Sequence, residues 1–211
     1  MKKILIFGLA RSGTTLLQQQ LSRSLRLMSY NEPFGDYKFR EQIGDPYQWV
    51  SSLPRAVIKV LAQNLDYIDL TKLIDAGKFD SIVVTKRSNL TDLCVSLYYA
   101  EQVTKNYHYT VAPDSINPFT VPPELVKEFF LISYRWYLGA MKQLNERSIP
   151  YTIFDYDQYQ ARDTLTINGV EFCLDNESKY GIDTISANID YSQVCVNYNE
   201  IDLLIKHENN C

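Results

Sequence analysis

The 211-residue sequence lacks the features of several specialised protein classes. It has only four cysteines, and no two of them form a C-x-x-C pair, so neither a disulfide framework nor a zinc site is predicted. No run approaches the ~20 apolar residues of a membrane-spanning helix. The apolar run at residues 4–10 imitates a signal peptide, but Arg11 interrupts it at once. We therefore expect reduced cysteines in a soluble, cytoplasmic protein.

The sequence also lacks a positive charge excess. Its 21 Lys and Arg against 25 Asp and Glu give a formal net charge of −4, and no basic stripe is present, so a nucleic-acid partner is not expected. Any anionic ligand must be held by a local site and not by a general positive field. With 45% hydrophobic and 22% charged residues, the chain is predicted to fold as a single domain, residues 1–211. Its oligomeric state is left open.

Apolar segments alternate with segments of helical periodicity along most of the chain. This alternation predicts an α/β fold, a three-layer parallel sheet with helices on both faces. Residues 106–122, rich in Asn, Pro, Tyr and Ser, are predicted to form a long surface loop, and the tail after Asp163 is ambiguous. The expected strands are 3–8, 27–30, 56–60 (a strand or a strand-to-helix junction), 81–85 and 151–154, and the expected helices are 14–27, 89–105 and 123–147.

A glycine loop lies between the first predicted strand and the first predicted helix. Residues 8–15 (GLARSGTT) have the G-x-x-x-x-G frame of a P-loop, followed by two hydroxyl residues. Glycines let backbone N–H groups converge on a phosphate at a helix N-terminus. The P-loop lysine is absent, because Thr14 occupies its position, which would handicap an ATP or GTP hydrolase. Arg11, inside the loop, carries a positive charge that can replace that of the lysine.

The loop resembles the 5′-phosphosulfate-binding loop of sulfotransferases that use 3′-phosphoadenosine 5′-phosphosulfate (PAPS). In that family a Lys or Arg precedes Ser-Gly-Thr-Thr, as Arg11 does here. The resemblance implies a P-loop nucleotide-kinase-like fold, with PAPS as co-substrate and no required metal. It also implies that Arg11 lies near the bridging oxygen of the leaving group, and that the following residues bind the phosphate: Ser12, Gly13, Thr14 and Thr15.

Two later segments extend the resemblance over roughly residues 3–160. Arg87 follows the strand 81–86, and Ser96 lies nine residues on. In the family such a pair binds the 3′-phosphate, and this spacing resembles the bacterial trehalose sulfotransferase group. A guanidinium and a hydroxyl can hold one phosphate from two sides. Residues 149–157 resemble the late strand of the family, whose role is mainly structural.

The acceptor hydroxyl needs a base, and positive charge must stabilise the transferring group. Many carbohydrate sulfotransferases use a glutamate after the second strand, and Glu32, followed by Pro33, matches that position. Lys59, in an apolar run, either points into the cleft and stabilises the transferring group or lies at the surface. His108 follows the second motif instead of preceding it, and we expect it to be an ordinary loop residue.

The sequence therefore predicts a PAPS-dependent sulfotransferase acting on a hydroxyl of a carbohydrate or other small acceptor, with Glu32, Arg11 and Lys59 as catalytic residues. Trp49 and the 106–122 loop are candidates for the acceptor wall. Two alternatives remain open. One is a small P-loop nucleotide or nucleoside kinase, which the missing lysine weakens, and the other is a non-catalytic nucleotide- or glycan-binding module.

Overall fold

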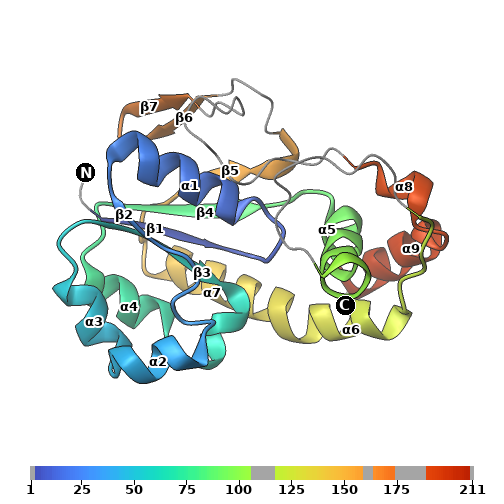
Figure 1. Ribbon diagram of the computed structural model, residues 1–211, viewed down its shortest axis with the longest axis horizontal. Coiled ribbons are helices and arrows are strands. Elements are labelled where there is room, and N and C mark those ends of the chain that lie inside the picture. The colour runs from blue at the N-terminus through green and yellow to red at the C-terminus, as the bar shows by residue number, and fades with distance from the viewer. Residues whose placement is uncertain (1–2, 106–116, 159–163, 174–188, 210–211) are drawn as a thin grey trace.

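Five parallel strands form one sheet at the centre of the molecule (Figure 1). The computed structural model describes residues 3–105, 117–158, 164–173 and 189–209. The strand order is β2-β3-β1-β4-β5. The chain begins at the central strand β1, adds β2 and β3 on one side of it, and then adds β4 and β5 on the other side. The strands are β1 (Lys3–Gly8), β2 (Met28–Tyr30), β3 (Ala56–Leu61), β4 (Ser81–Lys86) and β5 (Thr152–Asp155), with a separate antiparallel pair, β6 (Thr164–Ile167) and β7 (Val170–Cys173).

Helices connect the strands, and the longer ones cover the sheet. The α-helices are α1 (Thr14–Leu25), α2 (Tyr37–Ile43), α3 (Pro46–Ser52), α4 (Leu70–Gly77), α5 (Leu90–Tyr98), α6 (Pro123–Phe129), α7 (Arg135–Glu146), α8 (Tyr191–Val194) and α9 (Tyr198–Asn209). Two π-helical segments, η2 (Tyr99–Thr104) and η3 (Phe130–Tyr134), and two 3₁₀ segments, η1 (Ala62–Asp66) and η4 (Tyr156–Gln158), complete the helical elements. Within the described residues, no helix has the length and apolar character needed to span a membrane.

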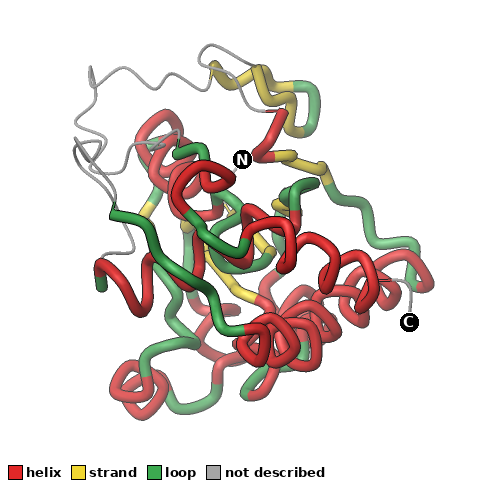
Figure 2. Tube along the Cα trace, turned by 90° about the vertical axis from the view of Figure 1, so that its right-hand side faces the viewer, coloured by secondary structure: helices red, strands yellow, loops and turns green. Residues whose placement is uncertain are grey.

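The central strands are apolar on both faces because both faces are covered. Ile4 and Ile6 of β1 pack with Leu17 and Leu21 of α1, and the β6–β7 hairpin closes that side. Side chains alternate between the two faces along a strand, and Phe7 of β1 belongs to the larger core on the other face. Residues of α4 and α7 complete that core. Figure 2 shows the hairpin at the top and the long helical segments at the bottom. The predicted α/β P-loop-like fold with helices on both faces is confirmed.

The predicted helices exist, but two of them change their geometry midway. The helix expected at 89–105 is α5 continued by η2, and the helix expected at 123–147 is α6, η3 and α7 in succession. A π turn holds one residue more than an α turn and is frequent at functional sites. Apolar periodicity did not reveal either π segment.

The tail that the sequence left ambiguous forms two structures. Asn168 (φ 49°) and Gly169 (φ 75°) make the turn between β6 and β7, the Asn-Gly signal of a two-residue hairpin. Helix α9 packs against α5 and α6. Most of the predicted 106–122 loop, with His108, lies outside the described residues, and Phe119 pairs with Cys195 in an isolated parallel bridge.

Candidate functional site

The carboxyl ends of all five parallel strands meet at one edge of the sheet, and the sequence-predicted residues follow those ends. Parallel strands direct their following loops to the same edge, where ligands bind in open α/β sheets. The glycine loop follows β1, Glu32 follows β2, and Arg87 follows β4. Lys59 lies within β3, the strand between β2, which Glu32 follows, and β1, which the glycine loop follows.

Both glycines of the loop stand where a side chain would collide with a neighbouring strand end. A Cβ atom at Gly8 would lie 1.9 Å from Oγ1 of Thr85, and one at Gly13 would lie 2.5 Å from Cδ2 of Tyr156. Gly13 also has a φ of 81°, a left-handed conformation that glycine adopts without strain. Glycine is therefore required at both positions, because the loop packs closely against β4 at Gly8 and against the turn after β5 at Gly13.

The serine and threonines of the loop have different environments. The hydroxyl of Ser12 is buried and lies 2.6 Å from Oγ1 of Thr85, while it donates to the carbonyl of Leu9 at 2.7 Å. Thr14 is also buried, at the first turn of α1. Gly13 is the N-cap residue of α1 and has no side chain to cap it, which leaves the first amide N–H groups of the helix to an incoming anion.

Lys59 brings the loop and Glu32 together. Its side chain is only 1% exposed, and its Nζ lies 2.7 Å from Oε1 of Glu32, whose side chain is 35% exposed. The same Nζ donates to Oγ1 of Thr15 at 2.7 Å. Lys59 is therefore not a surface lysine, and it connects the first turn of α1 to the loop after β2.

Burial and charge act on Lys59 in opposite directions. Loss of solvation lowers the pKa of its ammonium group, the nearby carboxylate of Glu32 raises it, and the charge of Arg11 lowers it further, with a net lowering. Glu32 itself has a φ of 52°, which is uncommon for a residue other than glycine. Its carbonyl accepts from the amide of Gly35 at 2.9 Å, and Phe34 beside it is fully buried, so the loop is anchored with the Glu32 side chain beside Lys59.

Arg87 and Ser96 are in direct contact. Nη1 of Arg87 donates to Oγ of Ser96 at 3.1 Å. The guanidinium also lies 3.1 Å from Asp157 and 3.6 Å from Asp92, and its side chain is only 10% exposed. The centre of the guanidinium lies 5.3 Å from the ring centroid of Tyr156. Because Tyr156 also contacts Gly13, one aromatic ring links the glycine loop to Arg87.

The end of β5 and the turn after it supply the carboxylates that hold this arrangement, and the sequence alone predicted no role for them. Asp157 accepts from the backbone amide of Asn89 at 2.6 Å as well as from Arg87. Asp155 accepts from Ser88 at 2.7 Å. Burial alone would raise the pKa of Asp155, but its bonds to Ser88 and Lys86 outweigh burial and lower it. Asp155 and Asp157 thus hold the β4–α5 turn in place.

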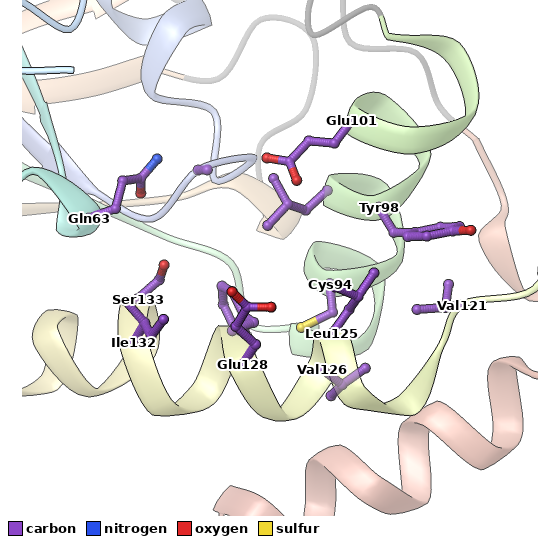
Figure 3. Close-up of a pocket in the computed structure, with 13 residues that line it drawn as sticks. Gln63, Cys94, Tyr98, Glu101, Val121, Leu125, Val126, Glu128, Ile132 and Ser133 are labelled. Atoms are coloured by element: carbon purple, nitrogen blue, oxygen red, sulfur yellow. The ribbon is translucent and has the colours of Figure 1, made fainter. Parts of the chain in front are cut away.

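A cavity of about 310 Å³ opens beside the glycine loop (Figure 3). Its walls come from α5 and η2 on one side and from α6 and η3 on the other, and Ala10 and Gln63 close the end nearest the sheet. Trp49 does not line this cavity. It packs edge-on against Tyr30, Phe34 and Phe39 at the β2 side of the sheet.

The fold and the loop define a P-loop-like α/β architecture with a lysine-free glycine loop. No protein-family model matches the sequence, and no curated protein matches it. Among solved structures, the chain is similar to the structure of deoxyadenosine kinase from M. mycoides with bound dCTP, at 15% sequence identity and a TM-score of 0.43. The match covers 74% of this chain and 91% of that chain. Among the described residues, no cluster of histidine, cysteine, aspartate or glutamate is placed to hold a metal ion.

Proposed function

We propose that this protein is a sulfotransferase that uses PAPS and transfers its sulfuryl group to a hydroxyl of a small acceptor. The observation that carries the proposal is the contact between Arg87 and Ser96 at the same edge as a glycine loop without lysine. The two anion-binding elements lie on either side of Tyr156. This arrangement suits a nucleotide that carries one phosphate group on the 5′ position of its ribose and another on the 3′ position.

The residues fit such a donor. The start of α1 would receive the 5′-phosphosulfate, because Gly13 offers no side-chain cap to the first amide N–H groups of the helix. Arg11 would supply positive charge at the leaving group, and Thr14 and Thr15 stand at the first turn of the helix. Arg87 would bind the 3′-phosphate through its guanidinium, with Ser96 as the second contact.

The chemistry is an in-line displacement at sulfur. The acceptor oxygen forms a bond to sulfur while the bond between sulfur and the bridging phosphosulfate oxygen breaks, and adenosine 3′,5′-bisphosphate (PAP) leaves. Glu32 takes the proton of the acceptor hydroxyl. The ammonium group of Lys59, fixed by Glu32 and Thr15, stabilises the negative charge on the transferring group.

A small nucleotide or nucleoside kinase remains the second candidate, since the glycine loop between β1 and α1 has the frame of a P-loop. A kinase needs positive charge at the β- and γ-phosphates, and Thr14 provides none. Analysis of the nucleotide that co-purifies with the protein separates the candidates. PAP supports the sulfotransferase and ATP supports the kinase, while PAP binding without sulfate transfer to any acceptor supports a binding module.

PAP is expected to bind in the absence of divalent metal. The proposed site neutralises phosphate with Arg11, Arg87 and backbone amides, so no bridging cation is needed. Calorimetric titration with PAP in EDTA, and again with Mg²⁺, checks this, with ATP as the matched ligand. Binding of ATP with an absolute requirement for Mg²⁺, and none of PAP, would contradict the sulfotransferase proposal.

Arg87→Ala is expected to weaken binding of PAP about 10- to 100-fold while changing the binding of AMP much less. The difference arises because AMP lacks the 3′-phosphate, and a charge-assisted contact of this kind contributes about 1.5–3 kcal/mol. The measurement is the ratio of the two dissociation constants in wild type and variant. Arg147→Ala is the control, because Arg147 pairs with Asp75 in α4. Equal losses for PAP and AMP would remove Arg87 from the 3′-phosphate site.

A further inference from the structure

The cavity beside the glycine loop has an apolar floor. Val121, Val126 and Phe129 line it and are almost fully buried, as is Cys94 opposite them. Leu125 and Ile132, at its mouth, are 37% and 41% exposed. A volume of about 310 Å³ lies at the lower end of the range for small-molecule sites. The lining favours an occupant with a compact apolar body that covers Leu125 and Ile132.

Two carboxylates face this apolar space from opposite walls. Glu101 belongs to η2 and Glu128 to α6, and Figure 3 shows both side chains directed into the cavity. Neither makes an ion pair or hydrogen bond with another residue that the structure describes. Burial raises the pKa of Glu101, and the negative charge of Glu128 raises it further, against the opposing effect of Arg11. The two carboxylates therefore repel each other across a space that a cationic group would fill favourably.

The cavity is continuous with the glycine loop. Ala10, within the loop, lines it, and the charge of the next residue, Arg11, is felt at Glu101. Across from Glu101, Gln63 also lines the cavity. Both walls contain π-helical turns, η2 with Glu101 and η3 with Ile132 and Ser133, and such turns are frequent at functional sites.

We propose that this cavity is the acceptor site, and that the acceptor is a small amphiphile with an apolar, aromatic-sized body, a hydroxyl and a protonated amine held by Glu101 and Glu128. This inference rests on the proposed function and narrows the acceptor from a carbohydrate or other small molecule to a hydroxylated amine. The apolar body packs on Val126 and Phe129. The hydroxyl points to the glycine loop, where its oxygen bonds to sulfur, its proton passes to the base, and PAP departs.

The test compares tyramine with 4-ethylphenol, which has the same ring and hydroxyl but no amine, and with glucose. Calorimetric titrations use the protein both free and saturated with PAP, so that binding in the cavity is measured independently of the donor. Tyramine is expected to bind about 10-fold more tightly than 4-ethylphenol, with a preference that decreases at high salt because the carboxylates are partly exposed. Glucose is expected to bind more weakly than either.

Variants locate the amine. Glu101→Gln and Glu128→Gln are each expected to weaken tyramine binding about 3- to 10-fold and to leave 4-ethylphenol unchanged. Glu124→Gln is the matched control, on α6 but outside the cavity lining. Equal binding of tyramine and 4-ethylphenol, tighter binding of glucose, or insensitivity to both glutamine substitutions would overturn the proposal. If those results appear while PAP still binds, the sulfotransferase proposal stands. If PAP does not bind at all, the proposed function fails, and the assignment of this cavity as an acceptor site fails with it.

Discussion

Glu32→Gln is expected to lower the turnover rate by about 10²- to 10⁴-fold, the contribution of a positioned general base. Affinity for PAP should be unchanged, because Glu32 follows β2 and, among the described residues, is linked to Thr15 of the glycine loop through Lys59. Glutamine keeps the shape of the side chain and a hydrogen-bonding oxygen toward Lys59, so the loop anchored by Phe34 should stay folded. Single-turnover rates with PAPS, and PAP titrations, measure the two effects separately.

A second glutamate tests whether the loss of turnover is specific to Glu32. Glu41→Gln, on the exposed face of α2, is the matched control and should behave as wild type. A Glu32→Gln variant with near wild-type turnover, measured where chemistry limits the rate, would remove Glu32 as the base and leave the donor site untouched.

Lys59→Met is expected to lower the turnover rate by about 10²- to 10³-fold, the effect of removing one preorganised electrostatic contact to developing charge. Burial lowers the pKa of Lys59, so its charge should be lost at a pH below the ordinary lysine range. The wild-type rate should therefore decline on the alkaline side as Lys59 deprotonates. In Lys59→Met the alkaline limb should be absent, and a pH–rate profile of both proteins checks this.

Stability distinguishes a catalytic Lys59 from a structural one. A lysine whose pKa is lower in the folded than in the unfolded protein destabilises the fold wherever it is charged, and the effect disappears as the pH rises through both pKa values. Methionine removes the buried charge and keeps the length of the side chain, and Glu32, 35% exposed, remains partly solvated. The variant should therefore melt at or above the wild-type temperature. Lys72→Met is the exposed control. A lower melting temperature with proportionate loss of activity would show a structural role.

The sequence predicted the parts of the fold that local pattern determines. The buried run of β1, the glycine frame and the strand β4 each carry their own signal, because a strand covered on both faces is apolar throughout. The spacing of Arg87 and Ser96 placed one after β4 and the other in the following helix, and the structure brings them within 3.1 Å. The same holds for Glu32, whose place after β2 puts it at the sheet edge.

The rest of the site depends on contacts between distant segments, for which no local pattern exists. Lys59 fits a surface position equally well until β2 pairs with β3 and α1 packs on that strand. Glu101 and Glu128 read as ordinary solvated acids, and only the packing of η2 beside α6 directs both into one cavity. The β6–β7 hairpin was predictable from Asn168-Gly169, since that dipeptide favours the required turn, but the apolar alternation on each side is only four residues long.

The carboxylates around Arg87 have a consequence for the proposed release of product. Arg87 pairs with Asp157 and Asp92, so an incoming phosphate would compete with them and would not meet an isolated cation. The gain on binding would be the phosphate contact minus the carboxylate pairing that it replaces, which is smaller than the value of the phosphate contact alone. In the proposed reaction, Asp157 and Asp92 would pair with the positively charged guanidinium again as PAP leaves. This competition would shorten the residence time of the spent nucleotide and return the site to the state that accepts the next donor.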